Sequence, residues 1–385
     1  MKIAYSTICI NPNGPFKQAG FLLQVNPIYN FHDDLHARII AFEDDEKILY
    51  HLSCDTLGWP INVQEAIEEQ AQKLTDKKVY VTVSATHTHF GANVRDIRYQ
   101  GEFVEKVLHA IPYLQFEEYD DVAVSYQCVP FEKVGTSRIS NHKANVLLQL
   151  FTIYANKKPL LQMMVHNCHP TIHSGTTPYF TSEYPGYVIS ELNRKYPDMY
   201  FTFMQGAAGD VSTRFTRPSQ DYAAVRALGD EMVKEVERLM ANEVEVVPFD
   251  KIVYASEVLP LEHEFNPIDL SNIPANLTPR ELETIQQGVI MRENLSKKLE
   301  NLVKQVKLSK MDFGPYTIVF CPNEAFSSYI DCVDTKRSAL AAYSNGYSPY
   351  LTGVADNFIT YEKFTDTVTV DAKNKYMDIL RKFGK

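Results

Sequence analysis

The chain has 385 residues, of which 45% are hydrophobic, and a formal net charge of −10 at pH 7. This acidic balance argues against nucleic acid or an anionic membrane surface as a partner, because both require basic patches. No apolar run approaches the length of a transmembrane helix, and the N-terminus lacks the apolar stretch of a signal peptide. The six cysteines are scattered without a CxxC pair, which argues against disulfides and a cysteine zinc site. We therefore expect a cytoplasmic protein.

Strand-like apolar runs alternate with helical patterns along the chain. The expected strands span 37–41, 47–52, 78–85, 121–127, 147–154, 160–166, 199–204 and 315–321. Apolar residues at helical spacing cover 222–239, and a capping-box sequence at Thr278 predicts a second helix that runs to about residue 308. This pattern predicts an α/β fold with mixed central β-sheets flanked by helices. We expect one domain over 1–385, with 243–310 as a partly helical insertion or seam.

Polar side chains follow four of the apolar runs, at the point where each expected strand ends. The segments are "SATHTHFG" with His87 and His89, "VHNCHPTIHSG" with His166, His169 and His173, "QGAAGDVSTR" with Asp210 and Ser212, and "CPNEAF" with Glu324. Period 2 would place His87 and His89 on the same face as Val79 and Val81. A lone histidine is more often structural, but α/β proteins place their sites at strand ends. Four such ends in one chain favour a site.

Two histidines and a carboxylate from separate strand ends are typical of catalytic zinc, which keeps one position open for water. Hydrolysis is the reaction class that such a site favours. A Ser-His-Asp hydrolase with Ser212 as nucleophile also fits, although the GxSxG elbow is absent. His166 and His173 are expected to be structural, and Asp210 to brace the loop backbone. Asp55 fits equally as a partner of a ligand histidine or as a buried, hydrogen-bonded aspartate.

These motifs resemble those of the neutral/alkaline (non-lysosomal) ceramidase family. "SATHTHFGAN" is similar to the family's SATHTHSGPGG, "CHPTIHSG…FTSEYPGY" to H-x-T…ISxDxxGY, "QGAAGDVSTR" to NxGDVSPN, "CPNEAF" to the PGE segment, and "YSNGYSPYLTG…TYEKF" to SNxYTxYxTT…YE. The matches follow the family order from about residue 80 to 365. The resemblance implies the family's catalytic domain, without the C-terminal immunoglobulin-like domain of secreted members.

The resemblance also implies roles for individual residues. It implies zinc ligation by His87, His169, Glu324 and Tyr350, contacts to the scissile carbonyl by His89 and Tyr361, substrate binding by Arg138, and the essential serine of the amidase motif at Ser212. Tyr347 is the rival of Tyr350. The implied reaction is hydrolysis of a linear N-acyl amide by water activated on Zn²⁺. The alternatives are a zinc hydrolase of an ester or peptide-like substrate, and an inactive metal-binding relative.

The chain departs from the family pattern around the expected substrate. Thr213 and Arg214 replace Pro-Asn, Asn323 replaces the glycine of PGE, and Glu183 replaces an aspartate. The polar loops at 92–100, 175–182 and 213–220 are expected to form the pocket, and they carry Arg95, Arg98, Arg214 and Arg217. Convergence of two of these cations would favour a soluble, polar N-acyl compound over ceramide. The expected partner is therefore a small N-acyl amide or a sphingolipid-like molecule.

Overall fold

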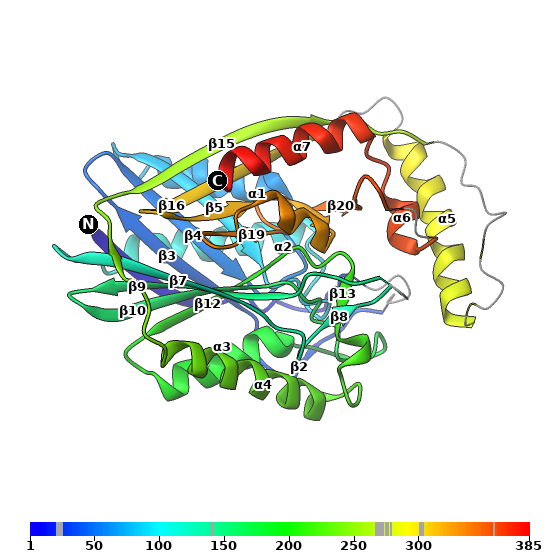
Figure 1. Cartoon of the computed structure of the whole chain (residues 1–385), viewed down its shortest axis with the longest axis horizontal. Helices are drawn as coiled ribbons and strands as arrows, with labels where there is room; N and C mark the ends of the chain where they lie inside the picture. Colours follow the sequence, from blue (N-terminus) through cyan, green and yellow to red (C-terminus); the bar gives the residue numbers. More distant parts are fainter. Residues whose placement is uncertain are drawn as a thin grey trace.

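Two five-stranded sheets face each other across an apolar core, and a third sheet packs against them (Figure 1). This computed structural model describes residues 1–20, 26–139, 142–265, 273, 277, 279–299, 304–356 and 359–385. The first sheet has the order β5-β4-β3-β1-β6, with β1 Lys2–Cys9, β3 His36–Glu43, β4 Lys47–Cys54, β5 Lys78–Ala85 and β6 Glu117–Glu118. The second has the order β12-β10-β9-β7-β14, with β7 Val122–Pro130, β9 Leu147–Ala155, β10 Lys158–His166, β12 Tyr200–Gln205 and β14 Val247–Pro248.

The third sheet and three short strand pairs complete the described strands. The third sheet has the order β15-β16-β17-β19, with β15 Ile252–Leu261, β16 Lys304–Phe313, β17 Tyr316–Phe320 and β19 Ser338–Ala341. The short pairs are β2 Asn30–Phe31 with β11 Tyr179–Phe180, β8 Thr136–Ser137 with β13 Val211–Ser212, and β18 Asn323–Ala325 with β20 Ser348–Leu351. All eight strands expected from the sequence are present, so the mixed α/β class is confirmed.

Helices α1 Ile61–Gln72, α2 Ile97–Ala110, α3 Glu183–Lys195, α4 Tyr222–Met240 and α7 Val370–Phe383 flank the sheets. α5 Pro279–Leu299 and α6 Tyr361–Thr365 instead pack against each other at one end of the molecule (Figure 1). Strand alternation explains this layering: Phe151 and Ile153 of β9 face the core between the sheets, whereas Leu148 and Leu150 face α3 and α4. Figure 1 shows α3 and α4 under the second sheet and α7 along β15. No helix in the described part of the chain combines the length and apolar composition needed to cross a membrane.

The long helix is shorter than its sequence pattern predicts. It ends at Leu299, and β16 begins at Lys304, so the expectation of a helix to about residue 308 is wrong. Val306 and Leu308 are buried because they alternate along a strand, and Val306 pairs with Leu259 of β15. The expected capping residue, Thr278, lies outside the described residues.

Two strand–helix–strand units bring the polar strand ends together. β4 and β5 are parallel and joined through α1, and β10 and β12 are parallel and joined through α3. Isolated bridges connect the ends of different sheets: Ser84 pairs with Ser344, and Gly206 with Ala341. Ligands of α/β proteins bind beyond the carboxyl ends of such parallel strands. The fold therefore gathers all four polar segments at one edge.

Candidate metal centre

A sharp backbone turn directs the two histidines that follow β5. The strand ends at Ala85, and His87 has a φ of +64°, in the left-handed region that costs a residue with a side chain about 1–3 kcal/mol. The alternation expected from the sequence therefore stops before the histidines. The turn is held by backbone hydrogen bonds from Ala85 to Tyr343 (3.2 Å) and from Thr86 to Cys54 (2.8 Å).

Backbone carbonyls fix the orientation of two imidazoles. Nδ1 of His87 donates to the carbonyl of Leu57 (2.6 Å), and Nδ1 of His169 donates to that of Ala208 (2.8 Å). Both rings are fully buried. Burial and the neighbouring His169 lower the pKa of His87 well below its usual value, and burial and Arg138 lower the pKa of His169 to about 3. Each ring is therefore neutral near pH 7, with a lone pair on Nε2, and this orientation is typical of metal-binding histidines.

Nε2 of His87, Nε2 of His169 and Oε2 of Glu324 converge on one point. The Glu324 oxygen lies 3.7 Å from the His87 nitrogen and 3.4 Å from the His169 nitrogen. Nε2 of His169 and Oε2 of Glu324 are buried and have no hydrogen-bond partner among the described residues. Two neutral imidazoles and a carboxylate directed at one point match the donors that Zn²⁺ takes in catalytic sites. These residues therefore fit a metal ion.

His89 also belongs to this cluster. Its Nε2 lies 3.2 Å from Nε2 of His87, and the ligand atoms of His87, His89 and His169 all lie within 4.8 Å of one another. Unlike the other two rings, His89 is partly exposed. Burial, His169 and Arg138 lower its pKa well below the usual value. The geometry thus places His89 within reach of the same ion and also on the accessible side of the site.

Two tyrosines from the β18–β20 region contact different members of the site. Glu324 and Tyr350 are neighbours in the parallel β18–β20 pair. The Tyr350 hydroxyl accepts a hydrogen bond from Arg138 (2.9 Å), whereas the Tyr347 hydroxyl donates to Oε1 of Glu324 (2.6 Å). Tyr343, which the sequence did not single out, packs its ring 3.9 Å from that of His87. Its buried hydroxyl has no hydrogen-bond partner in the described part of the chain.

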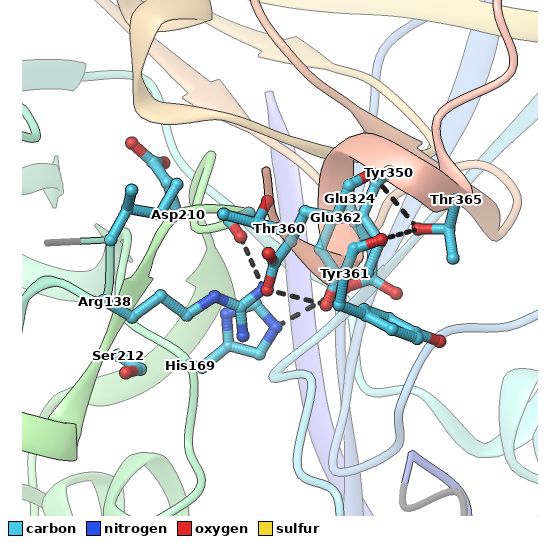
Figure 2. Close-up of polar contacts among 12 residues, drawn as sticks. Arg138, His169, Asp210, Ser212, Glu324, Tyr350, Thr360, Tyr361, Glu362 and Thr365 are labelled. Carbon is cyan, nitrogen blue, oxygen red and sulfur yellow. Dashed lines mark hydrogen bonds and ion pairs between the residues drawn. The ribbon is translucent and has the colours of Figure 1, made fainter. Parts of the chain in front are cut away.

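Arg138 joins the amidase loop to the tyrosines. Its Nη2 donates to the carbonyl of Gly209 (2.5 Å) and forms an ion pair with Glu362 (2.9 Å), a residue that the sequence did not predict. Burial opposes its charge, but Glu362 and Tyr350 raise the pKa of Arg138 above its ordinary value. The Tyr361 ring lies edge-on to that of Tyr350, with centroids 6.0 Å apart. Figure 2 shows these side chains gathered around His169.

Ser212 lies beside His169 without a catalytic base. The two residues form a backbone bridge, and Oγ of Ser212 accepts a hydrogen bond from the backbone of Arg214 (3.4 Å). No histidine or carboxylate hydrogen-bonds to Oγ among the described residues. The Asp210 carboxylate instead accepts bonds from Ser327 (2.6 and 2.7 Å) and from His142 (3.0 Å). Asp210 therefore braces the loop, and this geometry does not support a Ser-His-Asp triad.

Three other polar residues from the sequence analysis lie outside the cluster. His166 donates to the carbonyl of Leu147 (2.7 Å) and packs among aromatic rings, and His173 pairs with Glu183 (2.9 Å). Asp55 pairs with the buried guanidinium of Arg38 (3.0 Å). Of the two roles expected for Asp55, the structure therefore supports the buried, hydrogen-bonded aspartate and not the partner of a ligand histidine.

The positions of three polar-loop arginines and of one cavity bear on where the candidate site lies. Arg98 is exposed and paired with Asp96 (2.7 Å), Arg214 is exposed, and Arg217 donates to the carbonyl of Thr171. A cavity of about 420 Å³ is lined by residues such as Asp33, Arg38, Glu183 and Tyr222, and by none of the cluster residues. The chemistry of the donors, rather than this cavity, therefore locates the candidate site.

Comparison with known proteins gives the fold. Neither a protein-family model nor a curated protein sequence matches the chain. Among solved structures, a ceramidase complexed with C2 superposes with a TM-score of 0.76 at 12% identity, over 100% of this chain and 74% of that one. The neutral ceramidase from Pseudomonas aeruginosa superposes with a TM-score of 0.75, also at 12% identity and with the same coverage. The chain therefore has the fold of these ceramidase structures.

Proposed function

We propose that this protein is a zinc-dependent amidohydrolase that cleaves a linear N-acyl amide. The observation that carries the proposal is the convergence of Nε2 of His87, Nε2 of His169 and Oε2 of Glu324 at a buried point. Nε2 of His169 and Oε2 of Glu324 have no hydrogen-bond partner among the described residues, and burying two such groups costs several kcal/mol unless an ion or another ligand joins them. The likeness to ceramidase structures supports an amide as the bond cleaved.

In this proposal His87, His169, Glu324 and Tyr350 hold the metal. The hydrogen bond from Tyr347 to Oε1 of Glu324 favours this assignment, because it occupies the Tyr347 hydroxyl and keeps Oε2 directed at the histidines. A zinc ion held by these residues would polarise a carbonyl and would lower the pKa of a bound water toward 7.

The partly exposed residues act on the substrate. His89 and Tyr361 donate hydrogen bonds to the carbonyl oxygen as negative charge develops on it, which is usually the largest catalytic contribution. Arg138, held by Glu362 and Gly209, fixes Tyr350 and binds the substrate. Ser212 orients the substrate and the attacking water, since no base lies beside its hydroxyl.

Metal analysis combined with a hydrolysis panel tests the proposal. The gently purified protein is expected to carry about one zinc per chain and to hydrolyse N-acyl amides faster than matched esters and peptides. Preference for the esters or peptides would establish the alternative zinc hydrolase. Bound zinc with no turnover of any substrate would establish an inactive metal-binding protein, and the absence of a transition metal would overturn the metal assignment.

A further inference from the structure

The side chains of the candidate site differ in their exposure. His87 and His169 are fully buried, whereas His89, Arg138, Tyr347, Tyr350 and Tyr361 are partly exposed. We call the partly exposed side of the site its entrance, because a substrate can reach the buried histidines only past partly exposed side chains. The charged residues around them determine which substrates are attracted, because charges near a cleft mouth act on binding before the reacting groups meet.

Lys304 lies at this entrance. It is the first residue of β16, and its Nζ donates to the backbone carbonyl of Tyr347 (3.2 Å). No carboxylate pairs with Lys304 among the described residues, although Lys307 and Lys310 of the same strand each have one. Burial and the charge of Arg95 lower the pKa of Lys304 to about 8. Lys304 is thus a half-buried cation without a counter-ion.

Arg95 lies in a loop that is held over His89. The backbone of this loop is tied to an N-terminal segment by hydrogen bonds from Ala19 to Gly91 (3.2 Å) and from Asn93 to Lys17 (2.9 Å). In that segment, a Cβ added to Gly20 would lie 2.5 Å from Nδ1 of His89. The Arg95 side chain has no hydrogen bond or ion pair in the described part of the chain, whereas Arg98 is paired with Asp96.

The nearby carboxylates do not neutralise these two cations. Oε1 of Glu324 accepts from Tyr347 and Oε2 faces the histidines, and Glu362 is paired with Arg138. Burial and Glu324 raise the pKa of both Tyr347 and Tyr361, and the charge of Arg95 opposes this shift only in part. Among the described residues, the entrance therefore has an excess of positive charge, in a protein whose formal net charge is −10.

From this arrangement we infer that Lys304 and Arg95 bind an anionic group of the substrate, so that the enzyme selects N-acyl compounds with a carboxylate or phosphate close to the scissile amide. The inference rests on the proposed amidohydrolase function and adds the substrate class to it. A carboxylate or phosphate would gain charge-assisted hydrogen bonds from the half-buried ammonium of Lys304 and the exposed guanidinium of Arg95, and a neutral substrate would leave Lys304 without a counter-ion.

The experiment compares matched substrates on the zinc-loaded enzyme. N-octanoylglycine and N-octanoylphosphoethanolamine are the anionic substrates, and N-octanoylglycinamide is the neutral one. The wild type is expected to give the higher kcat/KM on at least one anionic substrate. Lys304→Met and Arg95→Gln should each lower the ratio of anionic to neutral kcat/KM about tenfold. Arg98→Gln and Lys307→Met are matched controls that should keep the wild-type ratio.

A binding measurement separates this inference from the proposed function. The metal-free protein is titrated with N-octanoylglycine and N-octanoylglycinamide by calorimetry, so the readout does not depend on turnover. Tighter binding of the carboxylate that weakens about tenfold in Lys304→Met supports the cationic entrance, even if no amide is hydrolysed and the amidase proposal fails. Equal binding of both compounds, or a ratio that Lys304→Met and Arg95→Gln leave unchanged, would overturn it.

Discussion

The hydroxyl of Tyr347 donates a 2.6 Å hydrogen bond to Oε1 of Glu324, while Oε2 of the same carboxylate faces His87 and His169. The two oxygens of Glu324 therefore have separate partners. Such a bond orients a ligating carboxylate and restricts its rotation, as the carbonyls of Leu57 and Ala208 do for the two imidazoles.

This division of contacts predicts different effects for the two tyrosines. Tyr347→Phe removes only the hydrogen bond to Glu324, so we expect zinc affinity to fall about 10- to 100-fold while the stoichiometry stays at about one. Tyr350→Phe removes a proposed ligand and should weaken zinc binding more. Competition titrations with a chelating dye measure both affinities. A greater loss in Tyr347→Phe would make Tyr347 the ligand.

His87 and His169 direct Nε2 at Glu324, whereas His166 lies outside the cluster. His87→Ala and His169→Ala should each reduce bound zinc to near zero, because either change removes a ligand from a site that no cysteine completes. His166→Ala should retain the metal, since the His166 ring bonds to the carbonyl of Leu147 and packs against Phe131. Metal content per folded chain, with folding verified by circular dichroism, is the measurement. Loss of zinc in His166→Ala would contradict the assignment.

Much of the fold could be predicted because the relevant signals are local. Period-2 runs such as 78–85 and 160–166 are strands, and polar residues directly after them lie at the site. The prediction was wrong at Val306, which fits both a helical and a strand spacing. Val306 continues the apolar spacing of α5, yet it is buried as part of strand β16. β15 was missed because Val253 and Val258 are exposed, which hides its alternation.

The contacts that complete the site could not be predicted from local patterns. The left-handed backbone at His87 depends on hydrogen bonds to residues far along the chain. Because position 87 is a histidine and not a glycine, the sequence does not indicate this conformation. The bond between Tyr347 and Glu324 depends on the pairing of β18 with β20. Similarly, only the fold brings Lys304 to the carbonyl of Tyr347 and Glu362 to Arg138.

His89 provides a test of how many histidines bind the metal. We expect His89→Ala to keep about one zinc per chain and to lower kcat at least 100-fold, because a donor to the developing oxyanion is lost. Metal analysis and steady-state kinetics on the same preparation give both values. Loss of the zinc together with the activity would instead establish a three-histidine site, which the 3.2 Å separation of the His87 and His89 nitrogens also permits.

The pair of His142 and Asp210 makes stability depend on pH. The hydrogen bond that His142 donates to Asp210 raises the pKa of His142 above 6.5, so the folded state binds this proton more tightly than the unfolded state. The resulting stabilisation is fully present below pH 6.5 and is lost as the pH rises through the raised pKa. His142→Gln should therefore cost more unfolding free energy at pH 5.5 than at pH 9, by no more than about 1 kcal/mol because the ring is partly exposed.

Denaturant titrations at the two pH values measure this difference. A cost of His142→Gln that is equal at both pH values would show that the ion pair with Asp210 does not contribute to stability.

Ser212 is expected to act on the substrate and not on the metal. Ser212 pairs with His169 through the backbone, and its hydroxyl accepts only the backbone N–H of Arg214 among the described residues. Ser212→Ala should therefore lower kcat at least 100-fold while the zinc content stays at that of the wild type. If Ser212 were instead a nucleophile, the wild type would show a burst of amine release at high enzyme concentration, followed by slower turnover. Rapid-quench kinetics beside metal analysis distinguish these roles, and loss of zinc in Ser212→Ala would place the serine at the metal instead.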